Sequence, residues 1–456
     1  MGIKSLKQKR TWQPDSWRHH EILQQPSWQD RKALQRNLNY IANQQPLVVC
    51  CDVDNLKKRL AQVQAGKAFI LQAGDCAESF SYATPEHIQG RLRIILQMAA
   101  VLCFGAGKPI VRIGRIAGQY GKPRSKPTEK VNGIEFPSYR GDLVNEPEAD
   151  ECSRTPNPQR LIRAFQHAST TLNLLRAYCS SDFASLSNVH AWNMEFIKET
   201  RIGQAYEKMA NDIDNALNFF EACGLDVSNQ PEFQAVEMFS SHEALVLEYE
   251  QMFIKRTCMN GWYDSSGHFL WIGDRTRQTD GAHIEFFRGL SNPIGIKIGP
   301  SCTEEDLETY LHILNPENEP GRLTLITRLG RKVMEEKLPK LIKVVQNSGI
   351  DVSWLCDPMH ENTFSCNGYK TRKFEDIFGE IEMFFQIHHE HGTYPGGIHL
   401  ESTFENVTEC LGGQAGITSD DLGKNYKSSC DPRLNGVQAL ELAFLVADIL
   451  KKTSRK

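Results

Sequence analysis

Short apolar runs recur eight times between residues 67 and 400, and each is followed by polar or glycine-rich residues and by a stretch long enough for a helix. Most of these runs are apolar throughout rather than alternating, which is typical of strands buried on both faces of a parallel sheet. Eight such strands with helix-sized spacers favour an α/β fold of the closed (β/α)8, or TIM barrel, type. The expected strands are Ala68–Ala73, Ile110–Ile113, Ala184–Val189, His268–Ile272, Ile294–Ile298, Leu323–Thr327, Val352–Leu355 and Gly397–Leu400.

Two parts of the chain fall outside this eightfold pattern. Residues 1–66 form an N-terminal extension with expected helices around 29–43 and 52–64, and residues 67–456 form the barrel. The spacer after the third run is too long for one helix, so we expect extra helices inserted at about residues 201–255. An open, doubly wound sheet is the alternative architecture, but no GxGxxG sequence follows the first run to support dinucleotide binding.

The bulk composition argues against several classes of protein. A net charge of -4 is unlike that of a dedicated nucleic-acid binder, which is usually basic. The longest apolar runs are too short to span a bilayer, and the basic segment Met1–Arg10 is not followed by the apolar core of a secretory signal. The 13 cysteines include no CxxC pair, which indicates reduced thiols in a cytoplasmic protein.

Basic side chains follow several of the expected strands at their C-terminal ends, where barrel enzymes carry their chemistry. The residues that would gather at this end are Arg115, Arg275, Lys297 and Arg328. Cations in a partly buried pocket repel one another unless an anion is bound. Guanidinium groups bind phosphate and carboxylate well. The pattern predicts a site for a phosphorylated substrate. The alternative is that each cation pairs with a neighbouring acid.

The loop Lys122-Pro123-Arg124-Ser125 carries two cations and a hydroxyl group on a proline-stiffened backbone. It is suited to a second phosphate group, and the alternative is a solvated basic loop. A different chemistry is open at Lys297, because a lysine at this position can form a Schiff base with a carbonyl substrate.

A candidate metal site combines one sulfur, one nitrogen and two oxygen donors from separate strand-end segments. Its members are Cys76, His360, Glu401 and Asp431. Such a mixed donor set suits a divalent ion such as Mn, Fe, Co or Zn. Cys76 could instead be a core thiol, and Glu401 an ion-pair partner. His399 shares a strand face with Glu401, which makes it a rival ligand.

The chain resembles class II 3-deoxy-D-arabino-heptulosonate 7-phosphate (DAHP) synthases from the Trp12–Trp17 segment to the last helix. The segments that carry the resemblance are long and unlike those of other barrel families. They are Gln72–Glu78, Arg115–Tyr120 with Lys122–Ser125, Trp271–Gln278, Lys297–Pro300, Asp357–His360, Glu401–Cys410 and Cys430–Arg433.

The resemblance implies condensation of phosphoenolpyruvate with D-erythrose 4-phosphate to DAHP and phosphate, the first step of the shikimate pathway to chorismate and the aromatic amino acids. It implies that a divalent metal ion is held by the four donors named above, with Mn2+ expected and Co2+, Fe2+ or Zn2+ as alternatives. Arg124 and Ser125 would bind erythrose 4-phosphate. The residues expected to bind phosphoenolpyruvate are Arg115, Lys122, Asp274, Arg275, Lys297 and Arg328.

Lys297 and Lys122 are the expected catalytic residues in this scheme. Several groups remain open as the residue that transfers protons: Glu401, Glu78, Lys122 and Asp274. The resemblance also implies a homo-oligomer, a dimer or tetramer, with contacts from the N-terminal extension and the inserted helices. Aromatic amino-acid effectors and a chorismate mutase partner are expected from the same resemblance.

Three residues depart from the family pattern. Asp274 stands where we expect a glutamate, Glu361 where we expect a glycine, and Leu329 where we expect a methionine. The first two change charged groups beside the substrates, which leaves the aldose phosphate less firmly assigned than phosphoenolpyruvate. The alternative function is a secondary-metabolism DAHP or aminoDAHP synthase that uses a related aldose phosphate. An inactive barrel kept as a regulatory scaffold is the alternative from another class.

Overall fold

A computed structural model describes residues 11–131, 133–199, 236–257 and 261–453, together with short stretches between 207 and 224. Eight parallel strands close into a barrel, and neighbours in the barrel are also neighbours among these strands along the chain. They are β1 (Phe69–Gly74), β2 (Ile110–Arg115), β5 (Phe239–Glu243), β8 (Phe269–Ile272), β9 (Ile294–Ile298), β10 (Leu323–Thr327), β11 (Ser353–Cys356) and β14 (Gly397–Glu401). The predicted (β/α)8 barrel is therefore confirmed.

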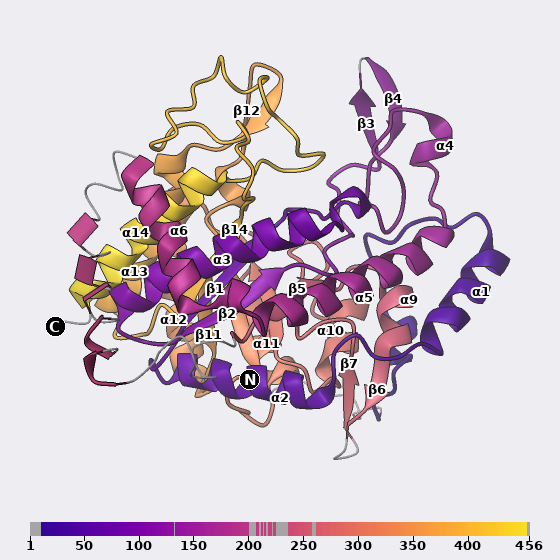
Figure 1. The fold of residues 1–456 in the computed structure, drawn as a ribbon. Helices are drawn as coiled ribbons and strands as arrows, with labels where there is room; N and C mark the ends of the chain where they lie inside the picture. Colours follow the sequence, from indigo (N-terminus) through magenta and orange to yellow (C-terminus); the bar gives the residue numbers. More distant parts are fainter. Residues whose placement is uncertain are drawn as a thin grey trace.

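Helices pack around the strands in the outer layer of the barrel (Figure 1). They are α3 (Pro85–Ala106), α5 (Gln159–Cys179), α6 (Leu186–Glu199), α10 (Ala282–Arg288), α11 (Glu304–Leu314), α12 (Arg331–Ser348), α13 (Phe374–Glu390) and α14 (Gly436–Thr453), with the single turn α9 (Leu247–Glu250). The single turn α4 (Glu151–Arg154) lies outside this layer, beside β4 (Ile134–Pro137). By length and composition α3 could cross a membrane, but 67% of its most apolar window is buried in the protein. Burial of this kind is also typical of a core helix.

The two expected N-terminal helices are present as α1 (Arg31–Ala42) and α2 (Cys50–Gln64). Leu56, Leu60 and Val63 of α2 are buried in one apolar cluster with barrel residues such as Ile70 and Leu355. Figure 1 shows α2 across one end of the barrel, and β3 (Thr128–Val131), β4 (Ile134–Pro137) and β12 (Phe364–Cys366) at the opposite end. The N-terminal extension is thus packed onto the barrel through apolar contacts.

The third expected strand is wrong. Ala184 ends a 3-10 turn and Leu186 begins α6, so the apolar residues of 184–189 belong to a helix that packs outside the barrel. The third barrel strand is β5, whose sequence FSSHE has one apolar residue, Phe239. Ser240, Ser241 and His242 are buried and hydrogen-bonded, so hydrophobicity could not identify this strand.

This strand lies inside the range 201–255 for which we expected inserted helices, so residues 239–243 are part of the barrel and not of an insertion. Most of the remaining residues, 201–235, lie outside the described ranges.

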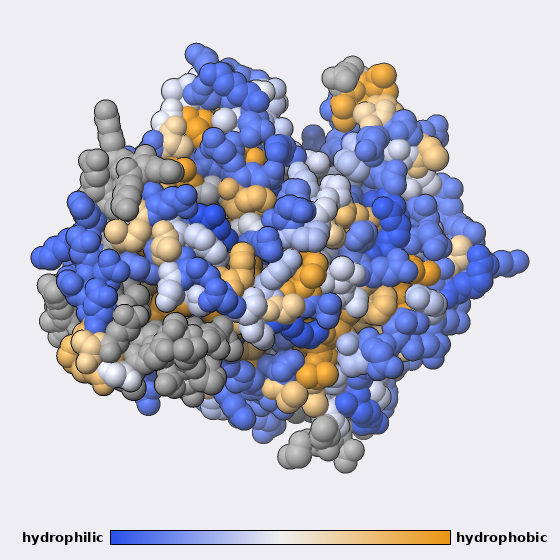
Figure 2. Space-filling view, viewed as in Figure 1, coloured by the Kyte–Doolittle hydropathy of each residue, from blue (hydrophilic) through white to orange (hydrophobic). Residues whose placement is uncertain are grey.

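In the described part of the chain, three antiparallel hairpins interrupt the strand-helix alternation. They are β3–β4 (Thr128–Val131 and Ile134–Pro137), β6–β7 (Ile254–Arg256 and Trp262–Asp264) and β12–β13 (Phe364–Cys366 and Tyr369–Thr371). The first and the third project beyond the C-terminal ends of the barrel strands (Figure 1). Figure 2 shows a hollow with a largely hydrophilic rim between these two projections.

Candidate active site

A cavity of about 680 Å³ lies at the C-terminal ends of the barrel strands, between the two projecting hairpins. Such ends gather residues from separate strands in every barrel enzyme. The candidate residues that line the cavity are Lys122, Arg124, Ser125, Asp274, Arg275, Lys297, Arg328, His360 and Asp431. The remaining three, Cys76, Arg115 and Glu401, are almost completely buried, at 2% exposure or less.

Three of the four expected metal ligands form one cluster. Sγ of Cys76 and carboxylate oxygens of Glu401 and Asp431 all lie within 4.8 Å of one another. Nε2 of His360 lies 3.2 Å from Oε1 of Glu401, so the fourth donor faces the same cluster. Four donors from four segments therefore converge, as a mononuclear metal site requires.

The ammonium group of Lys122 lies among these donors. Its Nζ is 2.9 Å from Sγ of Cys76, 2.8 Å from Oδ2 of Asp431 and 3.6 Å from Oε1 of Glu401. Burial would lower the pKa of Lys122, but these anionic neighbours outweigh it and hold the pKa well above its ordinary value. The sulfur and carboxylate donors thus surround a positive charge. A divalent ion in the same place would be surrounded by the same groups.

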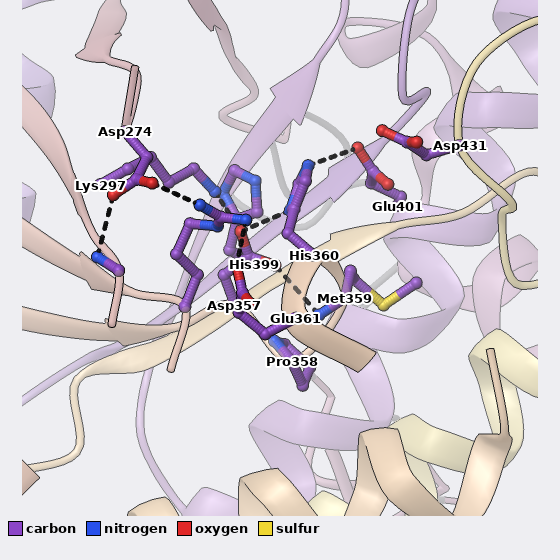
Figure 3. Close-up of polar contacts among 12 residues, drawn as sticks. Asp274, Lys297, Asp357, Pro358, Met359, His360, Glu361, His399, Glu401 and Asp431 are labelled. Atoms are coloured by element: carbon purple, nitrogen blue, oxygen red, sulfur yellow. Dashed lines mark hydrogen bonds and ion pairs between the residues drawn. The ribbon is translucent and has the colours of Figure 1, made fainter. Parts of the chain in front are cut away.

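Asp357 orients both His360 and Lys297. Its Oδ2 accepts a hydrogen bond from Nδ1 of His360 at 2.7 Å and pairs with Nζ of Lys297 (Figure 3). Burial opposes ionisation of Asp357, but His360 and Lys297 hold the pKa of its carboxyl group well below the ordinary value. Because Nδ1 of His360 is bonded to this carboxylate, its Nε2 faces Glu401. A metal-ligating histidine is usually held in this way, with its other ring nitrogen bonded to a carboxylate or a carbonyl group.

The rival ligand His399 is turned away from the donor cluster. Its Nε2 lies 2.6 Å from Nη1 of Arg115, and its Nδ1 lies 2.7 Å from Oε1 of Gln72. Burial and the positive charges of Lys297 and Arg115 lower the pKa of His399 well below its ordinary value, so the ring is neutral. Nε2 then accepts from Arg115 and Nδ1 donates to Gln72, which leaves neither nitrogen for a metal ion.

The candidate cations are neutralised unequally. Arg328 pairs with both Asp274 and Glu361, and Lys297 pairs with Asp357. Burial lowers the pKa of Lys297 to about 8, although Asp357 opposes this shift. The alternative expectation, that the cations pair with neighbouring acids, is therefore met at Arg328 and Lys297. A substrate anion that binds these residues has to compete with carboxylates inside the cavity.

A second group of candidate side chains, which carry two guanidinium groups and a hydroxyl group, lies at the rim. Nη2 of Arg275 donates to Oγ of Ser125 over 2.7 Å, which joins the strand-end loop to the basic loop. Arg124 pairs with Glu129 of β3. Arg275 is thus in contact with Ser125, which follows Arg124 in the basic loop, and all three residues line the cavity together with the expected phosphoenolpyruvate residues.

Glu78, one of the groups open for proton transfer, has a structural setting. Its two carboxylate oxygens accept hydrogen bonds from the backbone N–H groups of residues 117–119 and from Arg91. It fixes the turn after β2, in which Ala117 takes a φ of 64°. This saturation leaves Glu78 little capacity to exchange a proton with substrate.

Glu243 is a cavity residue that the sequence did not reveal, because it ends the unrecognised strand β5. It lines the cavity beside Gly273 and Lys297, and its Oε1 is buried without a hydrogen-bond partner. Burial raises the pKa of Glu243, although Lys122, Lys297 and Arg275 oppose the shift. A Cβ at Gly273 would lie 2.0 Å from Oε1, so only glycine there leaves room for this carboxyl group. The strand has one apolar residue, Phe239, so no apolar alternation in the sequence marks the position of Glu243.

Two buried arginines hold the segments that carry the donors. Arg372 donates to Oε2 of Glu401 at 2.8 Å and pairs with the carbonyl of Pro432. Arg433 joins Asp75, next to Cys76, to Glu409 at 2.7 and 2.8 Å. Ion pairs between segments far apart in the chain therefore fix the donors in place. Because the donors are already ordered, binding of a metal ion would cost less entropy than binding to mobile side chains.

Comparison with known proteins identifies close relatives over nearly the whole chain. The model of the class-II DAHP synthetase family matches residues 12–447. Proteins named phospho-2-dehydro-3-deoxyheptonate aldolase are similar to this chain: one from Streptomyces coelicolor is 49% identical over 439 residues, covering 96% of this chain and 97% of the relative. One from Mycolicibacterium smegmatis is 49% identical, covering 94% and 92%, and one from Neurospora crassa is 47% identical, covering 96% and 94%.

Proposed function

Because this chain belongs to the class-II DAHP synthetase family, we propose that it condenses phosphoenolpyruvate with D-erythrose 4-phosphate to give DAHP and inorganic phosphate. The observation that carries the proposal is that one cavity brings a cluster of possible cation ligands next to two groups of basic side chains suited to anions. The reaction needs both, since it joins a phosphorylated enol to a phosphorylated aldehyde.

The inner cations are proposed to bind phosphoenolpyruvate, which carries a carboxylate and a phosphate. Lys297 and Arg328 line the cavity, and Arg115 lies behind it against Glu401 and His399. Lys122, Asp274 and Arg275 complete the expected set. At the rim, Arg124 and Ser125 are proposed to bind the phosphate of erythrose 4-phosphate, with Arg275 between the two groups. Binding at these two places brings the enol carbon and the aldehyde carbon together.

Bond formation and phosphate release then follow from the chemistry of the substrates. C3 of phosphoenolpyruvate attacks the aldehyde carbon, and C2 becomes electron-deficient. Water adds to C2 and loses one proton, and the former aldehyde oxygen gains one. The bond between C2 and the phosphate oxygen then breaks, and the remaining proton of the C2 hydroxyl group passes to the departing phosphate as the C2 carbonyl forms. Arg328 and Lys297 stabilise the charge on the departing phosphate. Glu243 is our preferred acceptor for the proton of water, because its Oε1 has no partner in the cavity wall.

We propose metal dependence, with the ion held by Cys76, His360, Glu401 and Asp431. When bound, a divalent ion supplies Lewis-acid polarisation of the aldehyde oxygen. The mixed sulfur, nitrogen and oxygen set fits Mn2+, our first assignment, and also Co2+, Fe2+ or Zn2+. Burial raises the pKa of the Cys76 thiol and the ammonium group of Lys122 opposes this shift, so a divalent ion at this place would stabilise the thiolate further.

The test is phosphate release from phosphoenolpyruvate plus erythrose 4-phosphate, before and after chelation and after addition of each metal ion. We expect release that is lost with the chelator and restored by metal. Activity without metal would refute the metal proposal, and trapping of substrate on Lys297 by borohydride would favour the Schiff-base alternative. Preference for a nitrogen-containing aldose phosphate would instead support the aminoDAHP alternative, which the altered charges at Asp274 and Glu361 keep open.

Feedback control by aromatic amino acids is proposed for a second cavity of about 920 Å³, lined by residues of α2, α3, β2 and β5. Arg112 lies in its wall with Nε buried and unpartnered, and Glu237 lies in the same wall. This pair suits the carboxylate and ammonium groups of an amino acid, and apolar residues such as Leu96 and Phe239 suit its ring. Assays with tryptophan, phenylalanine and tyrosine, singly and together, test it; no inhibition by any would contradict it.

We further propose a cytoplasmic homo-oligomer, a dimer or tetramer, that can associate with chorismate mutase. The proposal is supported by family membership alone. Sedimentation of the purified protein, with and without a chorismate mutase from the same organism, measures both the oligomeric state and the association.

A further inference from the structure

The guanidinium group of Arg328 is held between two carboxylates. Its Nη1 donates to Oδ2 of Asp274 over 2.6 Å, and its Nη2 pairs with Oε1 of Glu361. Its Nε is buried without a hydrogen-bond partner. Both Nη groups, which a bidentate anion would use, therefore already face negative charge. An anion that binds Arg328 at either of these positions has to displace the acid that occupies it.

Asp274 is the acid that is fixed. Its Oδ1 also accepts hydrogen bonds from Nε of Arg277 at 3.0 Å and from the backbone N–H of Gly299 at 3.1 Å. The side chain of Glu361 is 32% exposed, compared with 17% for Asp274. Within the described part of the chain, Arg328 is the one polar partner of the Glu361 carboxylate. Glu361 is therefore the acid that can leave with the smaller loss of contacts.

The backbone of Glu361 is nevertheless held against Arg328. Glu380 of α13 is fully buried, and it accepts hydrogen bonds from the N–H of Gly330 at 3.0 Å and from Nδ2 of Asn362 at 2.6 Å. It thus fastens together the loop that follows Arg328 and the turn that carries Glu361. A Cβ at Gly330, where φ is 74°, would lie 2.9 Å from Cβ of Glu361, so the two loops meet closely.

We propose that Glu361 is a specificity-determining residue that competes with the anionic substrate for Arg328. Its carboxylate occupies Nη2 in the absence of ligand and swings toward solvent when phosphoenolpyruvate binds. A ligand then needs to contact neighbouring cations such as Lys297 as well, because an anion that reaches only Arg328 gains little over the internal carboxylate. The inference rests on the proposed function, in which Arg328 binds phosphoenolpyruvate.

The test compares Glu361→Gln and Glu361→Gly with the unmodified enzyme. Gln keeps the shape and removes the charge, and Gly removes the competitor entirely. We expect the KM for phosphoenolpyruvate to fall by about two- to fivefold, the range for a partly exposed ion pair, while the KM for erythrose 4-phosphate stays unchanged. Glu195→Gln is the matched control, because it removes one charge from an exposed pair with Arg93 on the outer helices and should change neither KM.

Calorimetric titration with phosphoenolpyruvate and, separately, with inorganic phosphate measures binding without turnover. Tighter binding of phosphoenolpyruvate by both Glu361 variants supports the inference, and equal or weaker binding overturns it. If the unmodified enzyme releases no phosphate from the two substrates, the proposed function fails. The two titrations still decide whether Glu361 competes with anions at Arg328.

Discussion

Nε2 of His399 accepts a hydrogen bond from Nη1 of Arg115 over 2.6 Å, and this contact assigns the two candidate histidines different tasks. Arg115 in turn donates to Oε1 of Glu401 at 3.1 Å. His399 therefore holds a cation beside the donor cluster, whereas His360 faces the cluster itself.

Replacement of His360 by glutamine and of His399 by leucine should separate these tasks. We expect His360→Gln to lose metal and nearly all activity, because one of the four donors is weakened. We expect His399→Leu to retain metal but to raise the KM for phosphoenolpyruvate about tenfold, because Arg115 loses its acceptor. Metal content after gel filtration, measured with the KM values, checks both. Loss of metal in His399→Leu would reverse the assignment.

Cys76→Ser should abolish metal binding and activity while the fold is retained. The hydroxyl group of serine is a poor replacement for a thiolate ligand, yet it fits the same space. Thermal unfolding and metal content measure the two effects. Cys302→Ser is the matched control, since this thiol is also fully buried but lies at the start of α11, away from the donors. Activity in Cys76→Ser comparable to that control would contradict a ligand role.

Glu243→Gln should lower kcat by about 100-fold or more and change the KM values little, as expected for loss of a general base. A base has to be ionised, so activity of the unmodified enzyme should rise with pH through the raised pKa of Glu243. The amide fills the space left by Gly273 but cannot accept the proton. A kcat–pH profile from pH 5 to 9 is the measurement. The acidic limb should disappear in the variant, and an unchanged profile would count against Glu243.

Glu380 should make the protein less stable as pH rises. Burial, with a contribution from Asp357, raises the pKa of Glu380 from 4.5 to about 8. The folded protein then keeps a proton that the unfolded chain releases near pH 4.5, so this contribution to stability is full below pH 4.5 and is lost as pH rises to about 8.

Glu380→Gln removes this dependence, because the amide does not titrate. Relative to the unmodified protein, its free energy of unfolding should therefore increase between pH 5 and pH 8.5, as measured in urea. Glu382→Gln, at an exposed position of the same helix, is the control and should show no pH-dependent difference. A difference between Glu380→Gln and the unmodified protein that is independent of pH would refute the assignment.

The sequence alone was sufficient to predict the barrel and to identify the polar residues at the ends of its strands. Seven of the eight expected strands are present because a buried parallel strand has to be apolar, and Ile294–Ile298 and Leu323–Thr327 agree with the structure at both ends. Parallel strands place their C-terminal ends together, so Cys76, Lys297 and Asp431 could be assigned to one site although up to 355 positions separate them.

Only the tertiary structure decided which of these residues face one another. Strand β5 is polar because Ser240, Ser241 and His242 hydrogen-bond inside the barrel, so neither the strand nor Glu243 at its end could be found from apolar periodicity. The direction of a ring nitrogen and the acid that pairs with a cation depend on neighbours from other strands. The choice of His360 over His399, and the position of Glu361 against Arg328, were therefore fixed by packing rather than by local sequence.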